Sequence, residues 1–262
     1  MSRSDKAVAE GWHGWDAYAP FYDWENARTV GRRDVAFWRH LAAAQDGPVL
    51  ELGCGTGRIT IPAARAGAQV VGIDRSAEML ARGRRRVKRL NGEGSASLVR
   101  GDIRMLPFRA RPGFHLVMAP YGILQSLTRE MDLRATLLSV HRLLRRGGLF
   151  GVDLVPDLPQ WSEYDRRVSL RGRRGKSRVT LIETVRQDPQ RRLTIFDHEY
   201  VERRGRSRRV HTFSLTFRTL SVAQMSRRLE SAGFEIRAIF GDYRGGPWDP
   251  LSDVWMILAG KP

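Results

Sequence analysis

The sequence predicts an α/β fold with a seven-stranded, mostly parallel sheet, an antiparallel final strand and an inserted antiparallel β-meander. Short apolar runs alternate with stretches of helical periodicity over residues 48–154, and the same order returns at 221–261. Between these parts, residues 168–218 lose the helical period and alternate between apolar and polar side chains. Strands that alternate with helices across short loops favour a parallel sheet covered on both faces. Alternation with a period of two favours antiparallel strands.

The first part of the chain contains the predicted strand–helix units. Helices are predicted at 31–44, at 58–66, from Ser76 onward and at 129–144; strands are predicted at 48–52, 69–73, 96–100, 114–119 and 149–154. Gly67 is expected to end the second helix in a C-cap role. Ser76 marks the start of the third helix as an N-cap, and Glu78 in its first turn suits the helix dipole.

The inserted part is predicted to hold three antiparallel strands, at 178–187, 192–203 and 208–217. Asp188-Pro189 and Gly205 stand where the turns are expected. In the last of these strands one face is predicted to carry His211, Phe213, Leu215 and Phe217. After the insert, Ser221 and Gln224 have the spacing of a capping box, which predicts a helix that Gly233 ends. Two closing strands are predicted at 234–241 and 254–261.

We expect one domain over residues 1–262, in four consecutive parts. These are an N-terminal lid and helix at 1–46, a cofactor-binding core at 47–159, the inserted sheet at 160–218, and a C-terminal helix with a closing β-hairpin at 219–262. Residues 11–24 are dense in aromatic side chains, which are expected to pack on the rest of the domain.

The composition excludes several classes of protein. Cys54 is the only cysteine, so a disulfide framework or a cysteine-rich zinc site within one chain is excluded, and no metal site is expected. No apolar run is long enough to span a bilayer, and the N-terminus lacks the apolar region of a secretory signal. We therefore expect a cytoplasmic protein with no membrane partner.

The chain is strongly basic, with a net charge of +17. Lysine accounts for 4 of the 45 basic residues, which leaves 41 arginines. Residues 165–218 hold 16 basic and 6 acidic side chains, a net charge of 16 − 6 = +10. Two interpretations remain open: an anionic partner such as RNA, or the arginine codons of a GC-rich genome, which we favour.

Residues 49–58, VLELGCGTGR, end an apolar strand in a glycine-rich loop. No lysine follows Gly57, so the loop is not a Walker loop, and its glycine spacing is one residue shorter than the dinucleotide fingerprint. Glu51 is a poor neighbour for a pyrophosphate and a good one for an ammonium group. Asp74, at the end of the next strand, suits ribose hydroxyls. A zwitterionic ligand without phosphate, such as S-adenosylmethionine, fits best, with its carboxylate at the helix N-terminus.

The chain resembles the class I S-adenosylmethionine-dependent methyltransferases. The resemblance rests on VLELGCGTGRIT, VVGIDRSAEML, VRGDIRMLPF, FHLVMAPYGILQSL and LLRRGGLFGVDL, which stand in the family's order and spacing over about residues 15–155. The final helix and two strands also match. This resemblance implies a Rossmann-like sheet and S-adenosylmethionine as the methyl donor, with S-adenosylhomocysteine as the product.

The resemblance also implies the roles of individual residues. The glycines of the loop would line the methionine moiety, Asp74 would hold the ribose, and Asp102 with Ile103 would meet the adenine edge. Met79 would pack near the adenine, Ala119 and its neighbours would lie near the sulfonium, and two tyrosines would form a lid. The cofactor-binding set is Tyr18, Tyr22, Glu51, Gly53, Gly55, Gly57, Asp74, Arg75, Met79, Asp102, Ile103 and Ala119.

The acceptor is less well specified by the sequence. In the family's small-molecule branch, an antiparallel insertion after the fifth strand covers the active site, which implies a small-molecule nitrogen or oxygen acceptor here. His198, His211 and Tyr121 are the weak catalytic candidates, and Ser126 stands where many small-molecule members have a histidine. Two alternatives remain open: an RNA methyltransferase that uses the Arg-rich insert, or a non-catalytic cofactor-binding protein. The insert is also a candidate homodimer surface.

Overall fold

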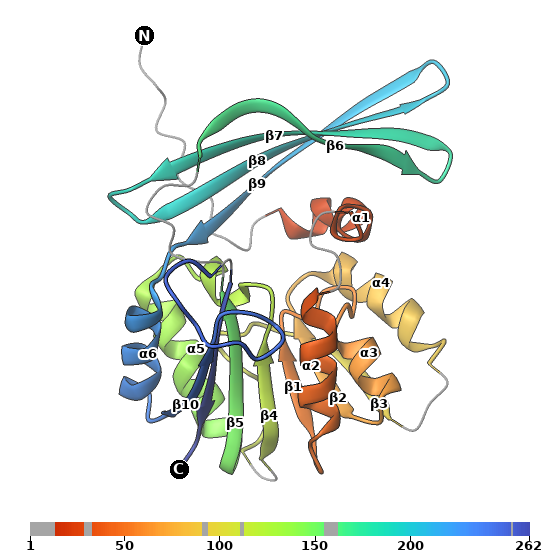
Figure 1. The fold of residues 1–262 in the computed structure, drawn as a ribbon. Coiled ribbons are helices and arrows are strands. Elements are labelled where there is room, and N and C mark those ends of the chain that lie inside the picture. The colour runs from red at the N-terminus through yellow and green to blue at the C-terminus, as the bar shows by residue number, and fades with distance from the viewer. Residues whose placement is uncertain (1–13, 29–32, 91–93, 111–112, 155–161, 253) are drawn as a thin grey trace.

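The computed structural model describes residues 14–28, 33–90, 94–110, 113–154, 162–252 and 254–262. These residues form a central sheet flanked by helices and a second sheet that lies above it, with one helix between the two (Figure 1). Among them, no helix is long and apolar enough to cross a membrane. The predicted boundary between core and insert, at 159/160, lies outside the described residues.

The central sheet has the predicted seven strands in the order β10-β11-β5-β4-β1-β2-β3. β1 pairs in parallel with β2 and β4, while β11 is antiparallel to both β5 and β10, which confirms the predicted antiparallel final strand. The strands are β1 Val49–Leu52, β2 Gln69–Asp74, β3 Ser95–Arg100, β4 Phe114–Ala119, β5 Leu144–Leu154, β10 Glu235–Phe240 and β11 Trp255–Gly260.

Helices cover both faces of this sheet, because its apolar strands must be buried on both sides. α2 and α3 pack against one face through a cluster that contains Trp38, Ile59 and Leu116. α5 and α6 pack against the other through a cluster that contains Leu137 and Met225. The helices are α2 Arg33–Ala43, α3 Thr60–Arg65, α4 Ala77–Val87, α5 Glu130–Leu143 and α6 Val222–Ser231, with a 3₁₀ helix η1 at Ile123–Ser126.

Local capping signals in the sequence are confirmed. The Ser76 side chain accepts a hydrogen bond from the Met79 N–H at the start of α4. Ser221 and Gln224 form the reciprocal capping box of α6. Gly67, which follows α3, has a φ of 97°, the left-handed conformation of a C-cap glycine.

The insert is a four-stranded meander, one strand more than predicted. Its strands are β6 Tyr164–Arg174, β7 Ser177–Asp188, β8 Leu193–Arg204 and β9 Ser207–Arg218. The missed strand is β6, whose pairing with β7 shifts register between Tyr164 and Arg167 and again between Val168 and Leu170. These shifts break the period of two that reveals a strand in a sequence.

α1, Trp15–Asn26, lies between the two sheets (Figure 1). Its aromatic side chains pack against the inner face of the insert, and the rings of Phe21 and Tyr200 stack with centroids 4.3 Å apart. Phe213 and Leu215 belong to the same buried cluster, which confirms the predicted apolar face of β9. The N-terminal aromatic segment therefore joins the insert to the rest of the domain.

Candidate functional site

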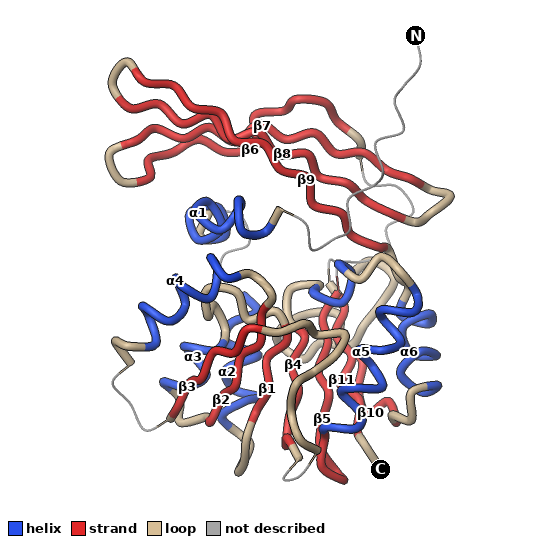
Figure 2. The backbone as a smooth tube through the Cα atoms, turned by 180° about the vertical axis from the view of Figure 1, so that it is seen from behind, coloured by secondary structure: helices blue, strands red, loops and turns tan. Residues whose placement is uncertain are grey.

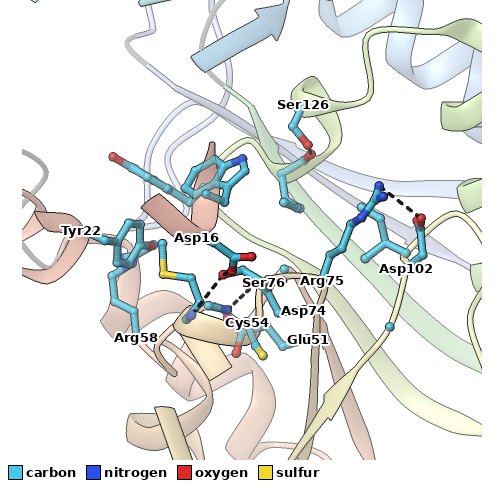
Figure 3. A pocket seen from close by; sticks show the side chains of 18 of the residues that line it. Asp16, Tyr22, Glu51, Cys54, Arg58, Asp74, Arg75, Ser76, Asp102 and Ser126 are labelled. Atoms are coloured by element: carbon cyan, nitrogen blue, oxygen red, sulfur yellow. Dashed lines mark hydrogen bonds and ion pairs between the residues drawn. The ribbon is translucent and has the colours of Figure 1, made fainter. Parts of the chain in front are cut away.

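A cavity of about 470 Å³ lies at the carboxyl ends of β1, β2 and β4, beneath α1 (Figure 3). Ligands of open α/β sheets bind at this edge. Most of the predicted site residues line the cavity: Tyr22, Glu51, Gly53, Gly55, Asp74, Arg75, Met79, Asp102, Ile103 and Tyr121. Among the described residues, Tyr18, Gly57 and Ala119 do not lie on its wall, nor do His198 and His211.

The glycine loop needs glycine for its conformation. Gly53, Gly55 and Gly57 have φ angles of 65°, 54° and 81°, in the left-handed region that side chains disfavour. A Cβ atom on Gly53 would also stand 2.5 Å from the Cδ1 atom of Ile123. Gly57 closes the loop instead of lining the cavity, since its N–H donates to the Cys54 carbonyl at 2.8 Å.

The carboxylate of Asp74 is held by the backbone at the end of β2. Its two oxygens accept hydrogen bonds from the Gly55 N–H at 2.7 Å and the Ser76 N–H at 2.8 Å. Burial raises the pKa of Asp74, and these N–H groups oppose that shift. The carboxylate is thus fixed at the cavity wall, where it can accept hydrogen bonds from ribose hydroxyls.

Glu51 and Arg58 bring opposite charges to the same cavity wall. Glu51 is 2% exposed, accepts a hydrogen bond from the Thr60 hydroxyl, and has its pKa raised by burial to about 7. The guanidinium of Arg58 forms two hydrogen bonds of 2.7 and 2.6 Å with the buried carboxylate of Asp34 on α2. Arg58 was absent from the predicted site, although its place directly after the glycine loop was a signal. Together the two charges suit the ammonium and carboxylate of an amino acid.

α1 is tied to the cavity by hydrogen bonds, which supports its predicted role as a lid. Asp23 accepts a hydrogen bond from the Thr56 hydroxyl at 2.7 Å, and Asp16 accepts one from the Ser76 hydroxyl at 2.5 Å. Tyr22 faces the cavity, as expected. Tyr18 turns toward the insert and packs in the cluster with Tyr200 and Phe213, and its hydroxyl donates to Glu25 of α1 at 2.8 Å.

Asp102 lies on the wall beside Ile103 but is already ion-paired. The Arg104 guanidinium donates to it at 2.7 Å, and Arg75 stands 3.6 Å away across the cavity edge (Figure 3). The Arg104 hydrogen bonds lower the pKa of Asp102. An adenine amine would therefore share this carboxylate with arginine. Met79 is 2% exposed; it belongs to the core cluster between α1 and the insert and also lines the cavity, where it can contact an adenine.

The loop after β4 carries Tyr121 in a strained conformation. Ala119 is fully buried within the strand, so its neighbours Pro120 and Tyr121 reach the cavity in its place. Tyr121 has a φ of 60°, which is rare for a residue with a side chain. Its ring lies under the Arg58 guanidinium, 4.9 Å from the guanidinium carbon.

Asp153 holds this loop in place and was not found from the sequence. It is 1% exposed at the end of β5 and accepts hydrogen bonds from the Gly122 N–H at 2.9 Å, the Trp38 indole at 3.2 Å and the Tyr243 hydroxyl at 2.9 Å. Burial raises the pKa of Asp153 to about 6. Its partners come from three separate segments, so no local pattern marks it.

The two candidate histidines lie on the inner face of the insert, packed toward α1. His198 is buried, with its Nε2 atom 2.9 Å from the Glu183 carboxylate, and its ring lies 6.1 Å from that of Tyr18. His211 stands 3.8 Å from Glu202. Their geometry matches a structural role between α1 and the insert, and gives no support to proton transfer in the cavity.

Comparison with known proteins is consistent with this site. Residues 49–148 match the family model described as "Methyltransferase domain". The chain is 30% identical over 218 residues to the cypemycin N-terminal methyltransferase of a Streptomyces species, covering 81% of this chain and 82% of that protein.

Solved structures show the same fold. The CcbJ methyltransferase of Streptomyces caelestis superposes with a TM-score of 0.80 at 22% identity, covering 94% of this chain and 97% of that one. The glycopeptide N-methyltransferase MtfA, complexed with S-adenosylhomocysteine, superposes with a TM-score of 0.59 at 25% identity, covering 88% of each chain.

Proposed function

Because the chain belongs to the S-adenosylmethionine-dependent methyltransferases, we propose that it transfers the methyl group to an amine nitrogen of a small molecule that enters the cavity beneath α1. The cavity has the volume of a small-molecule site, about 470 Å³. S-adenosylmethionine supplies an electrophilic methyl group on its sulfonium when bound.

The residues of the cavity fit that donor. Glu51 would accept a hydrogen bond from the methionine ammonium, and Arg58 would hold the carboxylate. Asp74 would accept from the ribose hydroxyls, and the left-handed glycines would let the backbone approach the ligand. Held by these contacts, the donor would keep its methyl group in one orientation within the cavity. Orientation of this kind supplies roughly 7–11 kcal/mol of a transfer barrier in favourable cases.

The observation that carries the choice of nitrogen is the lack of an available base on the described part of the cavity wall. This part of the wall includes no histidine, and each of its four carboxylates already accepts a hydrogen bond from the protein: Asp16, Glu51, Asp74 and Asp102. Burial raises the pKa of Tyr22, which also lines the cavity, to about 12. A hydroxyl acceptor would have to lose its proton to one of these groups. A neutral amine already carries its nucleophilic lone pair, so the wall need only orient it.

The relatives give this proposal further support. MtfA is named as a glycopeptide N-methyltransferase, and the cypemycin enzyme as an N-terminal methyltransferase. The rival interpretation as an RNA methyltransferase draws on the basic insert and on no feature of the cavity. The non-catalytic interpretation remains a hypothesis that turnover would exclude.

The experiment is a mass-spectrometric screen of the purified protein with S-adenosylmethionine against matched pairs of small amines and alcohols of the same carbon skeleton. We expect methylated amines and unmodified alcohols. Asp74→Asn is the control, since it should weaken S-adenosylhomocysteine binding and turnover together. Methylation of the alcohols alone, or of bulk tRNA alone, would refute the proposal, and so would turnover without any binding of S-adenosylhomocysteine.

A further inference from the structure

Two adjacent hairpin ends of the insert carry positive charge without any acidic residue. They are formed by residues 171–178, between β6 and β7, and by residues 203–209, between β8 and β9. Figure 2 shows both ends projecting beyond α1, away from the central sheet. The exposed basic residues on them are Arg171, Arg173, Lys176, Arg178, Arg203, Arg204, Arg206, Arg208 and Arg209. Within the described part of the chain, none of these side chains lies within ion-pair distance of a carboxylate.

Four of these arginines stand directly opposite one another across the whole sheet. Arg173 pairs in register with Arg178, Arg178 with Arg203, and Arg203 with Arg208. Residues in register share a face, and strands lie about 4.8 Å apart, so the four Cα atoms form a row about 14 Å long. We call these four residues the arginine row.

The arginine row faces away from α1. In β7 the neighbouring residue Val179 is buried in the cluster that packs on α1, and side chains alternate along a strand, so Arg178 points to the opposite face. Like charges directly opposite one another destabilise a sheet. The insert contacts α1 through its opposite face, so packing against α1 does not explain why four arginines stand side by side.

We propose that the outer face of the insert, centred on the arginine row, is a docking surface for an acidic segment of a polypeptide. Guanidinium groups bind carboxylates through paired hydrogen bonds, and a run of carboxylates would remove the repulsion within the row. Two aliphatic residues of the same face, Val210 and Val168, are each 42% exposed and can contact the partner's apolar side chains. Val210 lies two residues from Arg208 on β9, and Val168 lies farther along the sheet, opposite Ile182.

Other occupants fit this face less well. Sites for single-stranded nucleic acid combine cations with aromatic side chains on which bases stack. In the described strands, the outward positions around the row hold no aromatic residue; they are Arg171, Thr180, Ile182, Glu199, Val201, Val210 and Thr212. Glu199, the acid among them, is paired with Arg166 at 2.8 Å. A second copy related by a two-fold axis would place the same arginines against themselves. Charge repulsion therefore argues against this face as the contact surface of the homodimer expected through the insert.

The docking surface is distinct from the catalytic cavity. Among the described residues of the insert, Phe217, near the opposite end of β9, is the one that lines the cavity. Arg208 lies near the start of that strand, and the inner face of the sheet lies between the row and α1. Substitutions in the row therefore leave the cavity unchanged, and the proposal does not depend on the identity of the methyl acceptor.

The test is fluorescence anisotropy with a fluorescein-labelled peptide of ten glutamates and the full-length protein. The double variant Arg178→Glu/Arg203→Glu should weaken binding at least tenfold, or about 1.4 kcal/mol. A matched control, Arg145→Glu/Arg146→Glu, changes the net charge equally at exposed positions at the start of β5, and should change binding less than about twofold. The neutral double variant Arg178→Ser/Arg203→Ser should bind weakly and be at least as stable as the parent, which separates lost binding from misfolding.

Three results would overturn the proposal. The first is no binding of the peptide by the parent protein at low salt. The second is an equal loss in the row variant and in the matched control, which shows a response to net charge alone. The third is tighter binding of a labelled uridine 20-mer than of the peptide at the same salt concentration, with the same dependence on the row, which identifies a nucleic-acid surface.

Discussion

Replacement of Glu51 by glutamine should stabilise the unliganded protein and weaken the binding of S-adenosylhomocysteine. Glu51 is buried, and its pKa rises from 4.5 to about 7 on folding. The folded state therefore holds the proton more tightly than the unfolded state. The stabilising contribution is fully present below pH 4.5 and is lost as the pH rises through 7.

The size of the effect follows from the shift of 7 − 4.5 = 2.5 units. At 1.36 kcal/mol per unit, ionisation of Glu51 lowers the free energy of unfolding by about 3 kcal/mol at pH 8 relative to pH 4. Glu51→Gln keeps an oxygen for the Thr60 hydroxyl and removes the charge. Urea denaturation at pH 8 should show a variant more stable than the parent by up to about 3 kcal/mol. The exposed Glu230→Gln on α6 is the control and should match the parent.

Ligand affinity should change in the opposite sense, because the ionised carboxylate is the form that pairs with an ammonium. The ionised fraction of Glu51 rises about tenfold between pH 6 and pH 8 when its pKa is about 7. Calorimetric titration of the parent with S-adenosylhomocysteine should show about that gain in affinity, and Glu51→Gln should remove it. A variant less stable than the parent at pH 8, or a parent affinity that is constant over this range, would refute the reasoning.

Three further substitutions test the site. Gly53→Ala adds a Cβ atom 2.5 Å from Ile123 at a φ of 65°, and should cost about 1–3 kcal/mol of stability together with most ligand binding; an unchanged melting temperature would contradict this. Arg58→Met leaves the buried carboxylate of Asp34 unpaired and should cost about 3–5 kcal/mol in urea denaturation at pH 7, an effect that the double variant with Asp34→Asn should largely reverse. Asp153→Asn turns an amide N–H toward donors and should cost about 1–3 kcal/mol; a variant as stable as the parent would show that the three hydrogen bonds contribute little.

Several predictions from the sequence hold because their signals are local. The glycines at 53, 55 and 57 are needed wherever the chain turns with positive φ, so the loop is encoded by its own residues. Asp74 follows directly from its position at the end of a strand. The capping residues Ser76 and Ser221 act on N–H groups three residues away. The assignment of individual ligand contacts to these residues stays a prediction.

Other features depend on contacts between distant segments. Tyr18 and Tyr22 are four residues apart on one helix, yet only Tyr22 faces the cavity, because the insert takes up the other ring. His198 is paired with Glu183 on the neighbouring strand, and Arg58 with Asp34 on another helix. The residues of β6 do not alternate between apolar and polar with a period of two, because the strand shifts register twice against β7. Those shifts are defined by the pairing with β7 and cannot be recognised from β6 alone.

The sequence by itself determined the class of fold, the glycine loop and the acid at the end of β2, because periodicity and backbone conformation are properties of short segments. Only the tertiary structure decided which charges are paired and what faces the cavity. Arg58 and Asp153 gain their partners from α2, from the loop after β4 and from the segment before β11. The physical reason is that burial and ion pairing depend on the approach of segments far apart in the chain, and a sequence pattern within one segment carries no record of that approach.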